Sequence, residues 1–232
     1  EYRFKVQSKG AVVDATYTGI VPDTFKDDSE VVLKGRLDAS GFHVAPNGVM
    51  AMTTQGNPLW TVQVKTIGTP YRAAVIRFAN GTQIILGDDR GQVIALDTKG
   101  TELWRATINI TSYIRGLDDV TLNGTKYLAA ATQNGYVVLY DANGKSMWTY
   151  YLGEALRRVR VYDLKGDGNT ELIIGGDSSR LVILDPGTGK ELQRFMLGQA
   201  VTEIRNAEID GNPSTHEFIA GGKKVEKYSP SL

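Results

Sequence analysis

The chain has 232 residues, and its 26 Lys and Arg residues balance its 26 Asp and Glu residues, so the formal net charge is zero at pH 7. A zero net charge gives no indication of nucleic acid or an anionic membrane as a partner. The sequence has no cysteine, which excludes disulfides, thiolate metal sites and cysteine nucleophiles. No segment approaches the roughly 20 apolar residues of a membrane-spanning helix, so we expect no membrane span.

The beginning of the chain predicts short β-strands, because apolar and polar residues nearly alternate there. The pair Pro22-Asp23 supplies a turn signal within this run. We interpret residues 1–55 as a partial antiparallel β segment. Its expected strands cover residues 4–6, 12–17, 19–26, 30–37 and 41–45.

The stretch Tyr-x-Gly-Ile-Val-Pro-Asp-x-Phe, residues 17–25, is the specific part of this region. It resembles the periplasmic haem chaperone of cytochrome c maturation, an OB-type barrel, over that family's later strands. The resemblance implies a haem-attachment residue, histidine or cysteine, shortly after an Ala-Lys pair near Met50-Ala51. Here residues 52–54 read Met-Thr-Thr, and His43 lies within an expected strand, at a position that the family does not use. We therefore expect a partial OB-like segment that binds no haem covalently.

A repeat occupies the rest of the chain. An apolar residue followed by tryptophan, or once by glutamine, recurs at intervals of 44, 44 and 45 residues. Each copy follows a glycine-containing turn, and a strand that ends in aspartate precedes three of these turns. A period in the forties with four β-type segments per repeat is typical of β-propeller blades. The copies are Leu59-Trp60, Leu103-Trp104, Met147-Trp148 and Leu192-Gln193.

The repeats predict an all-β domain over residues 56–232, a β-propeller with about four four-stranded blades. The last blade has only three strands of its own, and a lone outer strand precedes the first blade. Closing the ring by combining the two leaves no exposed edge. The alternative is an open arc that needs another chain or a second copy to complete a larger ring. The expected blades cover residues 71–108, 115–152, 157–197, and 201–228 closed by 58–64.

Residues 91–104 read Gly-x-Val-x-x-Leu-Asp-x-x-Gly-x-x-Leu-Trp. This run resembles the quinoprotein-type, pyrroloquinoline quinone-like propeller repeat, and the resemblance covers about residues 57–228. It implies a propeller fold in which the blade tryptophans pack one blade on the next. It does not imply dehydrogenase activity, because the Trp floor, bound Ca²⁺ and catalytic aspartate of those enzymes cannot be assembled from these residues.

Residues 163–175 resemble the calcium loop of integrin-like propellers. Oxygen ligands at alternate positions of a glycine-bent turn suit Ca²⁺, which takes roughly six to eight hard oxygen ligands. Lys165 occupies a position where such loops carry Asp or Asn, and its ammonium opposes a cation. The alternative is a tight hairpin whose aspartates accept backbone N–H groups. The candidate calcium ligands are Asp163, Asp167, Asn169 and Glu171.

Three arginines each stand nine residues before a glycine of the inner-strand turn of their repeat. They are Arg72, Arg115 and Arg157, and the fourth repeat has Thr202 in their place. Because the start of an innermost strand faces the central channel, three guanidiniums there predict an anion-binding mouth for a carboxylate or phosphate. Tyr71 and Tyr113 flank this mouth. The alternative is that the arginines tie blades together by pairing with Asp118, Asp119 or Glu203.

No constellation in the sequence predicts a particular reaction, since His43 and His216 provide neither a catalytic triad nor a zinc-ligand spacing. We therefore favour a non-enzymatic binding or assembly propeller in the periplasm or outside the cell. Its expected partner is a protein or a second copy, its candidate ligand a small anion, and nucleic acid is not expected. One alternative is a haem-handling protein of cytochrome c maturation. Another is an engineered or recombined chain without evolved activity, indicated by the abrupt join of two incomplete modules.

Overall fold

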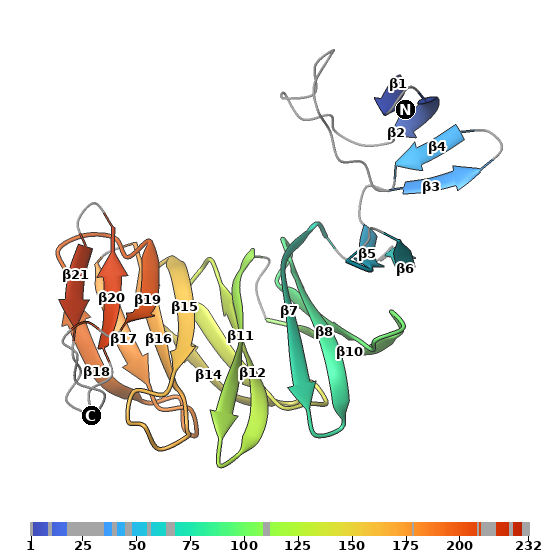
Figure 1. The fold of residues 1–232 in the computed structure, drawn as a ribbon. Helices are drawn as coiled ribbons and strands as arrows, with labels where there is room; N and C mark the ends of the chain where they lie inside the picture. The colour runs from blue at the N-terminus through green and yellow to red at the C-terminus, as the bar shows by residue number, and fades with distance from the viewer. Residues whose placement is uncertain are drawn as a thin grey trace. The chain divides into compact units, whose positions relative to one another are not determined.

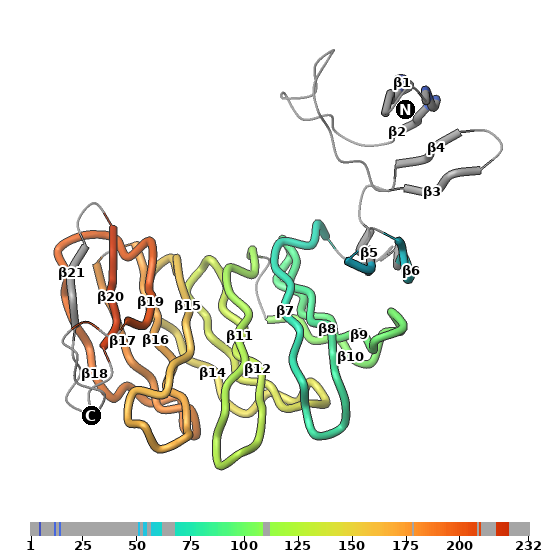
Figure 2. Tube along the Cα trace, in the orientation of Figure 1, coloured from blue at the N-terminus to red at the C-terminus, as the bar shows by residue number. Residues whose placement is uncertain are grey.

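The computed structural model describes residues 68–207 almost completely and shorter stretches elsewhere (Figure 2). Every element assigned in the described residues is a β-strand, which confirms the all-β prediction. None of these residues belongs to a helix long and apolar enough to cross a membrane. The chain divides into two compact units, Glu1–Thr69 and Pro70–Leu232. The described residues are 2–8, 11–17, 35–38, 41–44, 48–54, 57–63, 68–108, 112–177, 179–207, 209, 217–222 and 225–228.

The strands of the first unit are β1 Tyr2–Ser8, β2 Ala11–Tyr17, β3 Gly35–Asp38, β4 Gly41–Val44, β5 Gly48–Met52 and β6 Pro58–Gln63. Four of them form one sheet in the order β1-β2-β4-β3, and β5 pairs with β6. The pairs β1–β2 and β3–β4 are antiparallel, whereas β2 and β4 run parallel. The parallel pairing of β2 with β4 departs from the antiparallel expectation. It arises because β4 lies between β2 and β3, so that β2 is paired with β4 and not with β3, the strand that precedes β4 in the chain. The strand expected over residues 19–26 lies outside the described residues, and so do residues 30–34 of the strand expected over residues 30–37. Residues 35–37 of that strand belong to β3.

The second unit repeats one motif, an antiparallel meander (Figure 1). Three meanders have four strands and the last has three, as predicted for propeller blades. The strands of the first and second blades are β7 Pro70–Phe78, β8 Gly81–Asp88, β9 Gln92–Leu96, β10 Glu102–Thr107, β11 Ile114–Leu122, β12 Thr125–Thr132, β13 Tyr136–Tyr140 and β14 Ser146–Tyr151. Those of the third and fourth are β15 Leu156–Tyr162, β16 Glu171–Gly176, β17 Arg180–Leu184, β18 Glu191–Met196, β19 Glu203–Ala207, β20 Glu217–Gly221 and β21 Val225–Tyr228.

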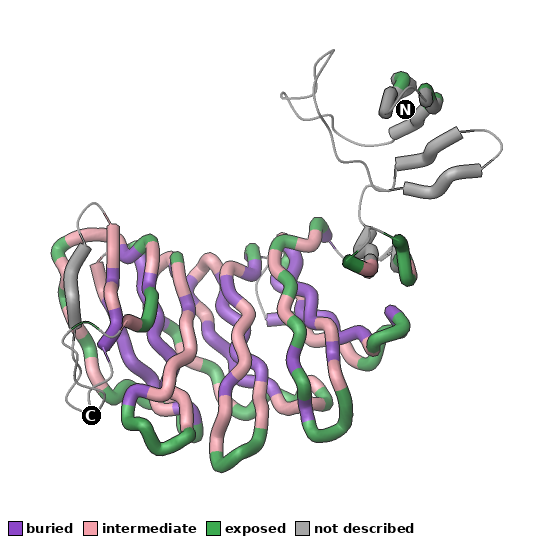
Figure 3. The backbone as a smooth tube through the Cα atoms, viewed as in Figure 1, coloured by how far each residue is buried: buried purple, intermediate pink, exposed green. Residues whose placement is uncertain are grey.

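The blades pack face to face, and the apolar core lies between them (Figure 3). The innermost strands of neighbouring blades, β7, β11, β15 and β19, contact one another in that order. One cluster of buried apolar side chains fills each of these three interfaces, so neighbouring blades bury apolar side chains against each other. Side chains contributed from the two sides of the interfaces are, in blade order, Ile85 and Leu128, Leu139 and Leu172, and Ile183 and Phe218.

The repeated pair of an apolar residue and tryptophan forms a β-bulge in the outermost strand of a blade. Leu103 is the extra residue between Glu102 and Trp104 of β10, and Met147 takes the same position in β14. Leu103 and Met147 are each 50% exposed. The bulge leaves the apolar residue in solvent and turns the tryptophan toward the following blade. The same bulge occurs at Leu59 and Leu192.

Two of the bulge tryptophans, Trp104 and Trp148, wedge one blade onto the next, as predicted. Trp104 Nε1 donates a hydrogen bond to Ala142 O at 3.1 Å. The indole also lies on Gly144, where a Cβ would be 2.5 Å from the ring. Trp148 repeats this contact one blade further on, because a Cβ at Gly189 would be 2.6 Å from its ring. Only glycine allows the ring to lie this close to the backbone of the turn.

The fourth blade has three strands in the described part of the chain, in the order β19-β20-β21. The described partner of β6 is β5. A β-strand has two hydrogen-bonding edges, and β5 takes one edge of β6. The closure of the fourth blade by residues 58–64 stays a prediction.

Replacing Trp148 by alanine should lower the free energy of unfolding by about 3–5 kcal/mol, because the change empties the wedge. It also removes the hydrogen bond from Trp148 Nε1 to Pro186 O, which is 2.9 Å long. Met147→Ala is the matched control, since this half-exposed neighbour should change the stability by no more than about 0.5 kcal/mol. Urea unfolding followed by circular dichroism measures both variants, and equal losses would contradict the wedge role.

Candidate anion-binding site

A pocket of about 350 Å³ opens where the innermost strands of the blades begin. Its volume falls in the range of small-ligand sites, about 300–1,000 Å³. The pocket brings together the three arginines singled out in the sequence, one each from β7, β11 and β15. The residue before β19 that takes their place in the fourth repeat, Thr202, also lines it. The rest of its polar lining consists of Gln133, Arg158 and Asp177.

The three arginines do not occupy equivalent positions of the repeat. The spacing of nine residues to a glycine misplaces Arg72 by one position. The residues that do share a position, each the bulge residue of its innermost strand, are Tyr71, Arg115 and Arg157. Arg72 follows its bulge, at the position that Arg158 holds in β15. The spacing misleads because the two glycines are not equivalent. Gly124 lies in the hairpin turn of its blade, whereas Gly81 already belongs to β8 and pairs with β7.

Arg72 and Arg115 donate to neutral oxygens. Arg72 Nε donates to Arg115 O, and Arg72 Nη1 to Tyr71 O, both at 2.9 Å. Arg115 Nη2 donates to Gln133 Oε1 at 2.9 Å, and Arg115 Nη1 to Tyr71 Oη at 3.2 Å. No ion pair of either arginine occurs among the described residues. Their positive charge is therefore not compensated by a protein carboxylate there.

Two tyrosines hold these guanidiniums in place. Tyr71 and Tyr113 meet edge to face, with ring centroids 5.3 Å apart. The Arg115 guanidinium carbon lies 5.4 Å from the Tyr71 ring centroid and 5.8 Å from that of Tyr113. Arg72 lies 4.8 Å from the Tyr71 ring centroid. Cation–π contacts of this kind restrict the rotamers of both arginines, as binding of an anion requires.

The other two pocket arginines have acidic partners. Arg157 Nε donates to Asp177 Oδ1, and Arg158 Nε donates to Glu203 Oε2 at 3.4 Å. The pocket therefore has a neutralised side, at Arg157, and an uncompensated side, at Arg72 and Arg115.

The carboxylates proposed as alternative partners take other roles. Asp119 pairs with Lys126. Asp118 is half buried, and its Oδ1 accepts the N–H of Asp119 at 3.1 Å. Glu203 pairs with Arg158, which the alternative did not include. Among the described residues, none of the arginines Arg72, Arg115 and Arg157 pairs with these three carboxylates. Arg72 and Arg115 nevertheless link the first two blades, through Arg115 O and Tyr71 Oη.

The acidic loop at residues 163–171 uses its oxygens on its own backbone. Asp163 Oδ1 accepts the N–H of Gly166 at 2.7 Å, and Asp163 Oδ2 accepts that of Gly168 at 2.8 Å. Glu171 is 1% exposed and pairs with Lys165, with Nζ and Oε1 3.4 Å apart. These contacts correspond to the tight-hairpin alternative. Calcium binding by this loop stays a prediction.

The two remaining candidate ligands of this loop also accept N–H groups. Asp167 Oδ1 accepts the N–H of Asn169 at 2.8 Å, and Asn169 Oδ1 accepts the N–H of Asn123 at 2.6 Å. In the described part of the chain, no three His, Cys, Asp or Glu side chains gather as a metal site would require. Asn169 therefore links the loop to the hairpin turn of the preceding blade.

An aspartate directly follows the third strand of each complete blade and closes the turn there. Asp97 Oδ1 accepts the N–H groups of Lys99 and Thr101, each at 2.8 Å. The N–H of Thr101 is the largest cause that lowers the pKa of Asp97 from its ordinary value of 3.8. Asp141 and Asp185 close their turns in the same way. These repeated aspartates therefore have a structural role.

Sequence reasoning missed three polar lining residues of the pocket, Gln133, Arg158 and Asp177. Arg158 could have been found, because Arg158 and Arg160 alternate along one strand and so share a face. Gln133 and Asp177 directly follow the second strand of their blades, and their position depends on how the strands pair. Of the two histidines, His43 lies in β4, and His216 lies outside the described residues.

Antiparallel blades that stack through their faces define a β-propeller. Residues 46–223 match the family model described as outer membrane protein assembly factor BamB, so the chain belongs to this family. Residues 1–53 match the CcmE domain. These matches confirm both resemblances, to the pyrroloquinoline quinone-like propeller repeat and to the haem chaperone. No curated protein matches the chain.

Solved structures show the same fold at low sequence identity. Sqt1 of Saccharomyces cerevisiae is 13% identical with a TM-score of 0.67, over 80% of this chain and 53% of its own. BBS1N, crystallised in complex with ARL6DN and soaked with lead, is 14% identical with a TM-score of 0.64, over 81% of this chain and 54% of its own. Raptor of Chaetomium thermophilum is 14% identical with a TM-score of 0.64, over 81% of this chain and 17% of its own. This chain thus spans about half the length of the first two.

Asp118→Asn should stabilise the protein at neutral pH. Burial is the largest cause that raises the pKa of Asp118 above its ordinary value of 3.8. Because the folded-state pKa is raised, the folded protein favours the protonated carboxyl group of Asp118. The stability that this protonated group contributes is present below pH 3.8 and is lost as the pH rises through the folded-state pKa. Asparagine keeps the oxygen that accepts the Asp119 N–H and carries no charge at any pH.

Chemical unfolding at neutral pH and below pH 3.8 measures the effect of this substitution. The variant should be more stable than the wild type at neutral pH, and the two should converge in acid. Asp119→Asn is the control, because it removes the partner of Lys126 and should give no gain at neutral pH. A loss of stability in Asp118→Asn at neutral pH would refute the argument.

Proposed function

We propose that the chain is a non-enzymatic binding and assembly scaffold that works outside the cytoplasm and holds a protein partner. The family of residues 46–223 is described as an assembly factor for outer membrane proteins, which supports both the partner and the location. The CcmE match of residues 1–53 supports the periplasm, because the haem chaperone it resembles works there. BBS1N, a chain of the same fold, is solved in complex with another protein.

The observation that carries the proposal is the arginine pocket. Arg72 and Arg115 place two guanidiniums in a concave site, and in the described part of the chain both donate to neutral oxygens. A guanidinium without an acidic neighbour keeps its full charge for a ligand, and its planar donors match a carboxylate or phosphate. The group recognised in the pocket is therefore anionic, on a protein partner or on a small ligand.

The proposed activity needs no chemical step. Asp88, one of a pair of neighbouring carboxylates, is 1% exposed. Its Oδ1 accepts the N–H groups of Arg90 and Gln92 at 2.9 Å and 2.7 Å, which closes the turn after β8. Asp89 follows it in that turn. A buried carboxylate that is saturated by backbone donors supports a structural role, and this supports a scaffold over an enzyme.

Replacing Arg72 and Arg115 together by glutamine should weaken partner binding by at least about a hundredfold. Each lost charge-assisted contact costs about 1.5–3 kcal/mol, and about 1.4 kcal/mol corresponds to a factor of ten. The matched control replaces Arg77 and Arg90, two exposed arginines of the same blade that do not line the pocket. Immobilised protein is exposed to an extracytoplasmic extract of its host, and the retained proteins are quantified. A double variant that retains the same proteins as the control would rule out the pocket as the recognition site.

A haem-handling role is the second candidate, favoured by the CcmE match of residues 1–53. Titration with haemin tests it through the Soret band, and a denaturing gel separates covalent from reversible binding. A Soret shift without haem on the denaturing gel would support reversible handling, because the residues after Ala51 lack the attachment histidine or cysteine of the family. An unshifted Soret band would remove this candidate.

A further inference from the structure

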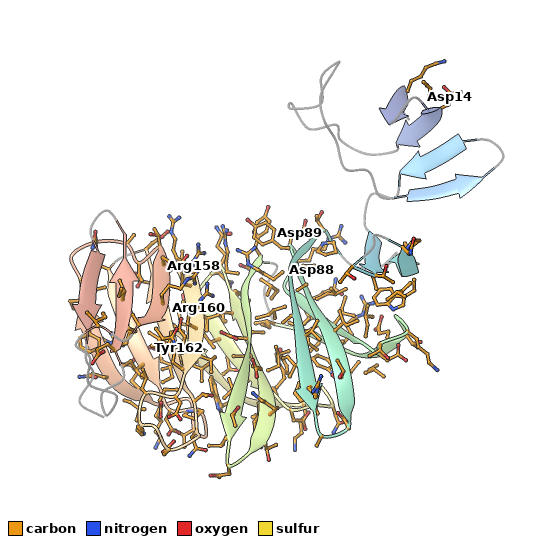
Figure 4. All side chains as sticks on the ribbon, in the orientation of Figure 1. Asp14, Asp88, Asp89, Arg158, Arg160 and Tyr162 are labelled. Atoms are coloured by element: carbon orange, nitrogen blue, oxygen red, sulfur yellow. The ribbon has the colours of Figure 1, made fainter. Side chains whose placement is uncertain are left out.

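A second group of arginines continues from the pocket along the innermost strand of the third blade. Arg158 and Arg160 stand two residues apart on β15 and follow one another down the strand (Figure 4). Both reach one carboxylate, because Glu203 lies 3.4 Å from Arg158 Nε and 3.3 Å from Arg160 Nη2. Arg205 Nη1 is 2.7 Å from the same carboxylate. One glutamate thus faces three guanidiniums, which leaves a surplus of positive charge.

The pocket and this second group form one positively charged surface, because Arg158 belongs to both. The side chains of Arg158 and Arg160 are 32% and 30% exposed, so a ligand can reach them. The chain as a whole carries no net charge, so positive charge is concentrated here by the fold. In the described part of the chain, the arginines of this surface are Arg72, Arg115, Arg157, Arg158, Arg160 and Arg205, and the facing carboxylates are Asp118, Asp177 and Glu203.

We propose that this surface binds an extended acidic peptide segment in which carboxylates alternate with uncharged residues. The inference rests on the proposed function and names the ligand class of its pocket. Side chains two residues apart on a strand lie about 6.6–6.8 Å apart on one face. An extended peptide has the same repeat, so one carboxylate enters the pocket beside Arg158 while the next on that face meets Arg160.

A single small anion fits this surface less well than a peptide. The pocket of about 350 Å³ has room for many water molecules, since one water needs only about 10–15 Å³ of such space. A small anion would therefore leave most of the pocket to solvent, and it could not reach the second group of arginines. An extended chain contacts both and displaces more of the water.

Nucleic acid also fits less well. Single-stranded nucleic acids are bound by aromatic rings on which bases stack. The rings of Tyr71 and Tyr113 are already engaged by Arg115 and by each other. Nucleic-acid-binding domains usually carry a marked positive net charge, whereas this chain carries none.

Fluorescence anisotropy with two labelled hexapeptides of equal composition tests the proposal. One peptide alternates glutamate and threonine, and the other has its three glutamates at positions 1, 2 and 5, so that no two of them are two residues apart. The alternating peptide should bind the wild-type chain about tenfold more tightly, since only this peptide places carboxylates two residues apart on one face. Arg160→Gln should remove this preference while leaving the weaker peptide unaffected. Arg77→Gln, the same charge change on an exposed part of β7, should preserve it.

Arg160→Lys and thermal unfolding separate loss of binding from loss of folding. The lysine keeps the charge, so this variant should retain part of the preference, and all variants should unfold at similar temperatures. Equal affinity for both peptides, or an equal effect of Arg160→Gln and Arg77→Gln, would overturn the proposal. Tighter binding of an oligothymidylate, or full competition by inorganic phosphate at an equal concentration, would also overturn it.

The two proposals fail separately. If Arg72→Gln with Arg115→Gln abolishes retention of a partner but the peptides bind without a spacing preference, the scaffold stands and the alternating ligand is wrong. If retention does not depend on Arg72 and Arg115, the proposed function fails whatever the peptides do.

Discussion

The distance between blades depends on one kind of contact, in which a large side chain of one blade lies directly on a glycine of its neighbour. A Cβ at Gly144 would be 2.5 Å from the Trp104 ring, and a Cβ at Gly87 would be 2.5 Å from Ile114 Cγ2. Any larger residue at these glycines would push the blades apart and open the clusters between them. The same contacts keep the starts of the innermost strands close together, so arginines from separate blades share one pocket.

The third blade shows what happens where the tryptophan wedge is replaced. Gln193 follows the bulge of β18 as Trp104 follows that of β10. Its Oε1 is buried and has no hydrogen-bond partner in the described part of the chain. An unsatisfied buried acceptor costs about 1–3 kcal/mol. Phe195 and Phe218 pack at this interface instead, edge to face with centroids 6.5 Å apart. The contact with the fourth blade therefore rests on apolar packing without the indole hydrogen bond.

The blades could be predicted from the sequence because an apolar residue followed by tryptophan recurs at the bulges of β6, β10 and β14, with Gln193 in the place of the tryptophan in β18. The alternation of apolar and polar residues does not reveal an extra residue in a strand, so the sequence did not predict the bulge at Leu103. The sequence also placed Arg72 at the wrong position of the repeat, because it does not distinguish a glycine in a strand, Gly81, from a glycine in a turn, Gly124. At Asp163 the difficulty is chemical, since carboxylate oxygens spaced for a cation also suit backbone N–H groups.

Small differences between equivalent positions give the pocket its direction. Gln133 and Asp177 each follow the second strand of their blade, and each accepts a hydrogen bond from the bulge arginine of that blade. The amide leaves the charge of Arg115 intact, whereas the carboxylate neutralises Arg157. Each contact satisfies a donor of the bulge arginine. The scaffold keeps its glycine contacts constant and varies one side chain per blade, and in this way a chain without net charge builds a pocket whose uncompensated positive charge lies on one side.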